Sequence, residues 1–324
     1  MSDLYKKILS YDRVALSKGI TLIESTKEAD QKKARNLINK IYKKSGKSFR
    51  IGISGPPGVG KSTFIETLGL FLIKKKYKLA VLTVDPSSKK SGGSILGDKT
   101  RMPELSTSSE AFIRPSPSGE ELGGVARRTR ESMILVESAG FDITIIETVG
   151  VGQSETTVSE MVDMFVVLLQ PASGDELQGI KKGIIEIADL LIVNKEDELR
   201  NEAERTVMEY KNALSLLKKD PEEFPIKVVK CSALKRTGIE NIWRIIDEFF
   251  KLSKRKGWLK RKRSEQLIKW IWNDLKSNIF ENIKQSTKLN KQFDNLEKKV
   301  LIGKMSPGEA SKKMLHDYRK NNKR

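Results

Sequence analysis

The eight residues from Gly55 to Ser62, GPPGVGKS, constrain this chain more than any other segment. They fit the pattern G-x-x-x-x-G-K-[ST], in which glycines let backbone N–H groups surround phosphate oxygens at the start of a helix. Residues 49–54 before them read as a buried strand, and residues 63–74 after them have helical apolar spacing. This order predicts a nucleoside triphosphate site in which Lys61 reaches the phosphates and Ser62 binds Mg²⁺. The predicted phosphate-binding residues are Pro57, Gly58, Val59, Gly60, Lys61, Ser62 and Thr63.

Two later apolar runs each end in a carboxylate: residues 79–85 in Asp85 and residues 141–147 in Glu147. Both are typical of buried parallel strands, whose carboxyl ends form the edge where ligands bind in α/β sheets. Glu147 begins an E-x-x-G segment, in which the carboxylate can hold Mg²⁺ and the N–H of Gly150 can meet a γ-phosphate. Each acid alone reads as an ordinary strand-end carboxylate, but their joint position after the phosphate loop favours the metal role.

The choice of base is indicated by residues 190–197, LLIVNKED, a further strand that ends in N-K-x-D. Guanine offers two neighbouring donors that one carboxylate can accept, and adenine does not, so Asp197 favours GTP over ATP. Asn194 is expected to brace the loop and meet the purine edge, and the aliphatic stem of Lys195 to cover the ring. After the next apolar run, the backbone of Ser232, Ala233 and Leu234 is predicted to bond the guanine carbonyl oxygen.

Composition agrees with an α/β protein of one large domain and a smaller appendage. Of 324 residues, 38% are hydrophobic and 32% charged, enough for a sizeable core. A single cysteine, Cys231, and a single histidine, His316, exclude an intramolecular disulfide and a Cys/His metal cluster. No apolar stretch reaches the roughly 18 residues that span a bilayer, and the first residues lack a signal-peptide core, so we expect a cytoplasmic protein without membrane contact.

The net charge of +19 is concentrated near the C-terminus, where residues 251–324 hold 22 Lys and Arg against 7 Asp and Glu. Such a segment can attract nucleic acid or an acidic partner. Because it lacks the interleaved glycines and aromatics of RNA-binding modules, a solvated helical face is the preferred interpretation, and nucleic acid is not the expected partner.

Three parts follow from the apolar spacing. Residues 1–48 are predicted to form amphipathic helices, residues 49–252 a doubly wound, mostly parallel P-loop GTPase domain, and residues 253–324 a basic helical arm. The apolar stripe of the arm, with Trp270 and Trp272, reads as a core or dimer interface.

Longer motifs in the chain resemble the MeaB/ArgK family of P-loop GTPases, which includes the methylmalonic aciduria type A proteins. The resemblance covers about residues 10–250. It is carried by residues 12–25 (DRVALSKGITLIES), 54–63 (SGPPGVGKST), 85–88 (DPSS), 91–102 (SGGSILGDKTRM), 147–155 (ETVGVGQSE) and 174–183 (GDELQGIKKG).

The resemblance implies a Mg²⁺-dependent GTPase that acts as a chaperone for methylmalonyl-CoA mutase, an adenosylcobalamin enzyme, by gating cofactor loading and protecting or reactivating the mutase. It also implies a homodimer formed through C-terminal helices. By motif, Asp85, Asp98, Ser62 and Glu147 belong to the metal and switch region. An ArgK-type kinase linked to arginine and ornithine transport, and an RNA-associated GTPase that uses the basic arm, remain as alternatives.

Hydrolysis is expected to depend on positioning and charge neutralisation, with Lys61 and Glu147 as the central groups. No glutamine directly follows Gly150, and Gln153 and Lys181 are the remaining candidates for catalytic groups. We therefore expect slow basal turnover that rises when a partner orders the segments around Gly150 and residues 174–182.

Overall fold

The protein is described here by a computed structural model covering residues 2–84, 101–116, 122–148, 154–171, 182–215 and 224–321. The chain divides into two compact units, Met1–Gln266 and Leu267–Arg324.

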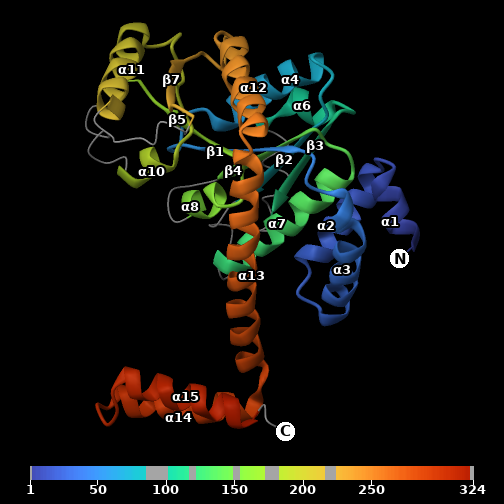
Figure 1. The fold of residues 1–324 in the computed structure, drawn as a ribbon, viewed down its shortest axis with the longest axis vertical. Coiled ribbons are helices and arrows are strands. Elements are labelled where there is room, and N and C mark those ends of the chain that lie inside the picture. Colours follow the sequence, from blue (N-terminus) through green and yellow to red (C-terminus); the bar gives the residue numbers. More distant parts are fainter. Residues whose placement is uncertain are drawn as a thin grey trace. The chain divides into compact units, whose positions relative to one another are not determined.

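The first unit is built on one seven-stranded sheet whose pairings are all parallel among the described residues (Figure 1). In sheet order the strands are β3 (Ala111–Ser116), β2 (Leu79–Val84), β4 (Ile143–Thr148), β1 (Phe49–Ser54), β5 (Met164–Leu169), β6 (Leu190–Val193) and β7 (Lys227–Lys230). Every residue of β2, β4, β5 and β6 is buried, because helices cover both faces of the sheet. The predicted doubly wound parallel sheet is confirmed.

The strand order places a topological switch point at β1. The chain builds β2, β3 and β4 on one side of β1 and then β5, β6 and β7 on the other. Ile53 of β1 is in register with Glu147 of β4 and with Val166 of β5. The loop that follows β1 therefore emerges between the carboxyl ends of β4 and β5, the position where open α/β sheets bind ligands.

Helices α4 (Lys61–Lys74) and α12 (Ile239–Arg255) contact each other and share one hydrophobic core with the strands. The short α6 (Pro103–Thr107) packs against α4. Helices α7 (Leu122–Ser138) and α8 (Ser154–Ser159) cover other parts of the sheet, and Val158 of α8 lies against Gly52 of β1. Helices α10 (Lys182–Ile187) and α11 (Arg200–Ser215) pack along β5, β6 and β7.

The N-terminal residues form the predicted helices, α1 (Ser2–Leu9), α2 (Arg13–Glu24) and α3 (Glu28–Ile41), followed by the 3₁₀ turn η1 (Tyr42–Lys44). Asp12 caps α2 by accepting the N–H groups of Val14 and Ala15 at 2.9 Å. The apolar side of α2 and α3 packs on α7, so this segment braces that helix (Figure 1).

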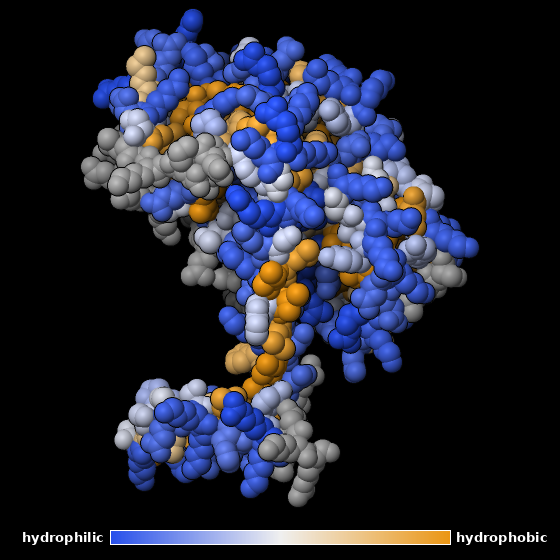
Figure 2. Space-filling model, in the orientation of Figure 1, coloured by the Kyte–Doolittle hydropathy of each residue, from blue (hydrophilic) through white to orange (hydrophobic). Residues whose placement is uncertain are grey.

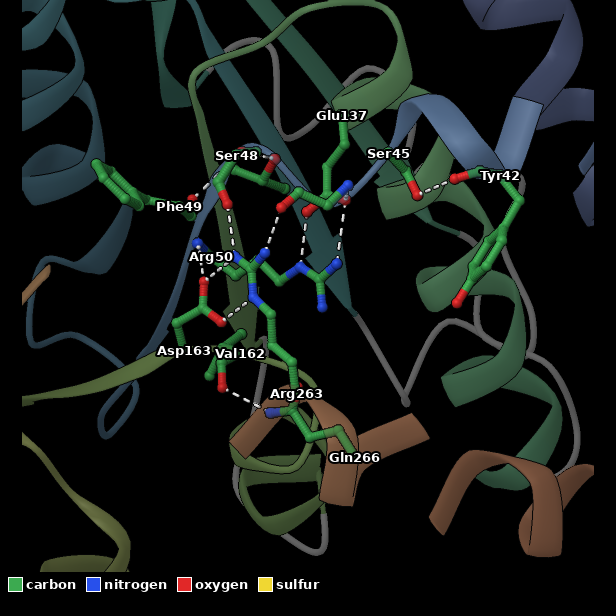
Figure 3. A network of polar contacts seen from close by, with 12 residues as sticks. Tyr42, Ser45, Ser48, Phe49, Arg50, Glu137, Val162, Asp163, Arg263 and Gln266 are labelled. Atoms are coloured by element: carbon green, nitrogen blue, oxygen red, sulfur yellow. Dashed lines mark hydrogen bonds and ion pairs between the residues drawn. The ribbon is translucent and has the colours of Figure 1, made fainter. Parts of the chain in front are cut away.

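A polar network at the amino-terminal edge of the sheet connects helix α13 (Trp258–Gln285) to the loops that precede β1 and β5 (Figure 3). Arg263 donates to both carboxylate oxygens of Asp163, at 2.7 and 2.6 Å, and to the carbonyl oxygen of Ser48. Asp163 also accepts the N–H of Arg50, whose guanidinium forms a buried ion pair with Glu137 of α7. One buried carboxylate thus connects a late helix to the first strand.

The second unit contains the rest of α13 and the helices α14 (Thr287–Leu301) and α15 (Pro307–Asn321), which pack on each other around Leu296 and Ala310. Within this unit α13 carries a continuous apolar stripe, visible as an orange band in Figure 2. Its exposed members are Leu267, Ile268, Ile271, Trp272, Leu275, Ile279 and Phe280.

Candidate nucleotide-binding site

The phosphate loop connects β1 to α4 as the motif predicts. Gly60 has φ +89°, and a Cβ at this position would lie 2.8 Å from Nδ2 of Asn194, so only glycine fits. Val59 is buried beneath the loop, while Pro57 and Gly58 are exposed at its tip. The loop thus presents backbone outward at the amino end of α4, the arrangement that binds anions.

Lys61 lies inside this loop. Its ammonium donates to the carbonyl oxygens of Gly55 at 2.8 Å and Pro56 at 3.1 Å. Burial lowers the pKa of Lys61, although the neighbouring carboxylates of Glu147 and Glu155 act in the opposite direction. The fold therefore holds a partly desolvated cation at the bottom of the predicted phosphate site.

Ser62 and Glu147 meet directly, although 85 residues separate them. The Ser62 hydroxyl, in the first turn of α4, donates to Oε1 of Glu147 at 3.1 Å. Glu147 is 2% exposed near the end of β4, where the hydroxyl of Thr148 also donates to that of Ser54 at 2.9 Å. The predicted pair is thus brought together at the junction of β1, β4 and α4.

This donor set fits Mg²⁺, because hydroxyl and carboxylate oxygens are hard ligands and Mg²⁺ is usually held by few protein groups together with substrate phosphates. No cluster of three or more His, Cys, Asp or Glu side chains suited to a metal occurs among the described residues. A single hydroxyl–carboxylate pair beside a phosphate loop is what a substrate-dependent Mg²⁺ site requires.

Asn194, after β6, links three segments distant in sequence. Its Nδ2 donates to the Val59 carbonyl oxygen at 2.8 Å, and its Oδ1 accepts the N–H of Ala233 at 2.9 Å. The expected bracing role of Asn194 is therefore present in the geometry. Lys195 follows with φ +61° and is half-buried, and Asp197 is exposed in the turn beyond it.

The loop after β7 is closely held. Ser232 and Thr237 exchange backbone hydrogen bonds, and the Ser232 hydroxyl accepts the N–H of Lys235. The Ala233 carbonyl oxygen accepts the hydroxyl of Thr67, in α4, at 2.9 Å. Sequence reasoning missed Thr67, because one threonine in an apolar helix gives no signal of a partner so far along the chain.

Cys231 lies at the base of this loop and is buried. Burial, together with the carboxylates of Glu196 and Asp197, raises the pKa of its thiol to about 12. The residue therefore acts as a small core side chain next to the site, as its apolar surroundings in the sequence predict.

Five predicted site residues lie outside the described part of the chain: Asp85, Asp98, Gly150, Gln153 and Lys181. Their roles stay predictions from the sequence.

A pocket of about 560 Å³ opens at the opposite edge of the sheet, between α10, α12 and the start of α13. It is lined by residues that precede β5, β6 and β7, among them Asp163, Asp189 and Ile226. It lies at the amino ends of the strands and shares no lining residue with the phosphate loop, so it is not the nucleotide site.

Comparison with known proteins identifies the family to which this chain belongs. Residues 16–288 match the family model described as methylmalonyl Co-A mutase-associated GTPase MeaB. The chain belongs to the MeaB family. As a member of this P-loop GTPase family, it is a GTPase and binds guanine nucleotide.

MeaB relatives match along nearly the whole chain. The mouse methylmalonic aciduria type A homolog is 46% identical over 98% of this chain and 79% of its own length. A putative GTPase of Caulobacter vibrioides is 45% identical over 97% of both chains. The crystal structure of a protein described as LAO/AO transport system kinase superimposes with a TM-score of 0.77 at 32% identity, covering 98% of this chain and 97% of that one.

Among the described helices, none combines the length and apolar character needed to cross a bilayer.

Proposed function

We propose that this GTPase is Mg²⁺-dependent and acts as a chaperone for an adenosylcobalamin-dependent methylmalonyl-CoA mutase, gating cofactor loading and protecting or reactivating the mutase. The observation that carries the catalytic part is the contact between Ser62 and Glu147 beside Lys61. The mutase part is supported by the family description and by relatives named for methylmalonic aciduria.

The site residues have distinct tasks in hydrolysis. Lys61 neutralises charge on the phosphates, while the backbone of Gly58 to Ser62 orients them. Ser62 and Glu147 hold Mg²⁺, which supplies further charge neutralisation when bound. Because Lys61 is partly desolvated within the loop, its charge on the phosphates is screened less by water than that of an exposed lysine.

Base recognition is assigned to Asp197, which accepts both guanine donors, with Lys195 against the ring and Asn194 as the brace. GTP should bind at least about tenfold more tightly than ATP, and Asp197→Asn should shift preference toward xanthine nucleotides. Titration calorimetry of wild type and variant with GTP, ATP and XTP measures both. Equal affinities of the wild type for GTP and ATP would refute the base assignment.

The partner assignment is tested with purified methylmalonyl-CoA mutase of the same organism. Binding and phosphate release are measured with GTP, a non-hydrolysable analogue and GDP. A chaperone coupled to hydrolysis must bind the mutase differently in these states, and the mutase should accelerate GTP hydrolysis. Absence of binding in every state, with a mutase shown to be active, rejects the chaperone role and leaves the GTPase intact.

A homodimer formed through the stripe on α13 is part of the proposal. Contiguous exposed apolar residues such as Ile271, Trp272 and Leu275 are typical of a protein interface. Light scattering should give twice the chain mass for the wild type and for Asn273→Glu, which changes an exposed polar position on the opposite side of the helix from the stripe, but a reduced mass for Ile271→Glu. A monomeric wild type contradicts the dimer.

Two alternatives are separated by simple assays. An ArgK-type kinase linked to arginine and ornithine transport, which agrees with the description of the superimposed crystal structure as a transport system kinase, would transfer the γ-phosphate to an acceptor other than water, whereas a GTPase transfers it to water. An RNA-associated GTPase would bind RNA through Lys254, Arg255 and Lys256 with an affinity that falls steeply as salt rises.

A further inference from the structure

We propose that Thr67 is a positioning residue for base recognition, which aims the backbone N–H of Leu234 at the 6-oxo group of guanine. This inference rests on the proposed placement of the base beside Asn194 and the loop after β7, and it assigns the donor within that loop.

The hydroxyl of Thr67 is directed out of its own helix. A threonine inside an α-helix commonly donates to the carbonyl oxygen four residues earlier. Thr67 is 7% exposed in the middle of α4, yet its hydroxyl donates at 2.9 Å to the carbonyl oxygen of Ala233, which is 166 residues away in sequence. Such a buried, long-range bond fixes the loop to the helix.

Five N–H groups of the loop already have protein acceptors, those of Ser232, Ala233, Lys235, Arg236 and Thr237. The N–H of Ser232 donates to the Thr237 carbonyl oxygen, and that of Ala233 donates to Oδ1 of Asn194. Within the described ranges the N–H of Leu234 has no protein acceptor, and the residue is 67% exposed. Leu234 thus carries the donor that this loop can offer to a ligand.

The bond from Thr67 sets the direction of that donor. The carbonyl group of Ala233 and the N–H of Leu234 belong to one peptide unit, which is planar and trans, so they point in opposite directions. The Ala233 carbonyl oxygen accepts the Thr67 hydroxyl at 2.9 Å and, at the longer distance of 3.3 Å, the N–H of Arg236. Because the shorter bond from Thr67 holds the carbonyl oxygen against α4, the N–H of Leu234 is held facing the other side. The N–H of Ala233, bound to Asn194, fixes the preceding peptide unit in the same way.

The same helix holds the phosphates. Thr67 lies five residues after Ser62 on α4. The same helix therefore positions both the phosphate-binding residues and the loop that binds the base. Asn194 makes the parallel link from the base side to the phosphate loop through Val59. The distance between the phosphate loop and the N–H of Leu234 is thus fixed by α4, which favours binding of a nucleotide whose phosphates and base span that distance.

The test compares GDP with two analogues that change one edge group each. In 6-thio-GDP a sulfur, a weak hydrogen-bond acceptor, replaces the 6-oxo group, whereas IDP lacks only the 2-amino group. Dissociation constants are measured for wild type, Thr67→Val and Thr67→Ser. The control is Thr129→Val, which removes another buried helical hydroxyl, one that donates to Val125 within its own helix.

In the wild type and in Thr67→Ser, GDP should bind more tightly than 6-thio-GDP. In Thr67→Val this preference should fall about two- to tenfold, the value of one neutral hydrogen bond, while the preference for GDP over IDP is retained. Thr129→Val should keep both preferences. If Thr67→Val does not fold, Thr67→Ala, which introduces no bulk, carries the same expectation.

An unchanged preference in Thr67→Val, or an equal loss of affinity for all three nucleotides, overturns the role of Thr67. A wild-type protein that binds GDP and 6-thio-GDP equally overturns the placement of the 6-oxo group at Leu234. A wild-type protein that does not prefer GTP over ATP would instead reject the underlying guanine site.

Discussion

The ion pair between Arg263 and Asp163 should be a principal support of the first unit, and Arg263→Met tests this. The Asp163 side chain is fully buried and accepts two hydrogen bonds from Arg263, at 2.7 and 2.6 Å (Figure 3). In Arg263→Met, the N–H of Arg50 at 2.9 Å is the one donor among the described residues that remains to bond this carboxylate. Removing one partner of a buried pair costs about 3–5 kcal/mol, because the remaining charge is desolvated and uncompensated.

The assay is urea-induced unfolding followed by circular dichroism. Arg263→Met should lower the free energy of unfolding by about 3–5 kcal/mol. The double variant Asp163→Asn with Arg263→Met should lose less than the sum of the two single losses, because the stranded charge is gone. Arg205→Met is the control, since the Arg205–Glu209 pair is largely exposed and should contribute at most about 1 kcal/mol.

A loss in Arg263→Met no larger than that in Arg205→Met would refute this reasoning. It would mean that Asp163 finds water or another donor when Arg263 is removed, and that helix α13 is anchored to the sheet mainly by apolar contacts.

Three further predictions concern the nucleotide site. Ser62→Ala and Glu147→Gln should lose Mg²⁺-dependent GTP hydrolysis while circular dichroism stays native; unchanged phosphate release in both variants at constant Mg²⁺ would place the metal elsewhere. Lys61→Met should abolish hydrolysis without lowering the urea midpoint of the nucleotide-free protein. Burial lowers the pKa of Lys61, so its charge opposes folding at every pH below about 10. A clearly lower midpoint in Lys61→Met would contradict this. Cys231, with a pKa raised to about 12, should react with iodoacetamide at pH 8 only after denaturation, since about one thiol in 10⁴ is ionised in the native protein. The contribution of its neutral thiol to stability should be complete below about pH 9 and lost as the pH rises toward 12. Rapid alkylation of the native protein would show that the thiol is accessible.

Local patterns alone identified many elements of this fold, although not β3 or β5, and predicted most of the site. The apolar runs that became β2, β4 and β6, the glycines of the phosphate loop and the residues Lys61, Ser62 and Asn194 could be assigned because strand burial and turn geometry depend on stretches of about ten residues. The parallel sheet followed from the order of these stretches and the family resemblance from longer motifs, and both are confirmed. The roles of Asp85, Asp98, Gln153 and Lys181 still rest on the sequence.

Only the tertiary structure decided which polar groups meet. The bond from Thr67 to Ala233 spans 166 residues, that from Asn194 to Val59 spans 135, and that from Arg263 to Asp163 spans 100. The N-K-x-D motif indicated that Asn194 braces a loop, but no local pattern names the partner in any of these bonds. Each pairing depends on the strand order, which brings β1 between β4 and β5 and places β6 and β7 beyond them. The sequence by itself therefore determined which chemical groups are available to the nucleotide site, whereas the packing of strands and helices determined how those groups are positioned. A long-range hydrogen bond forms only where the fold has already brought its two groups together.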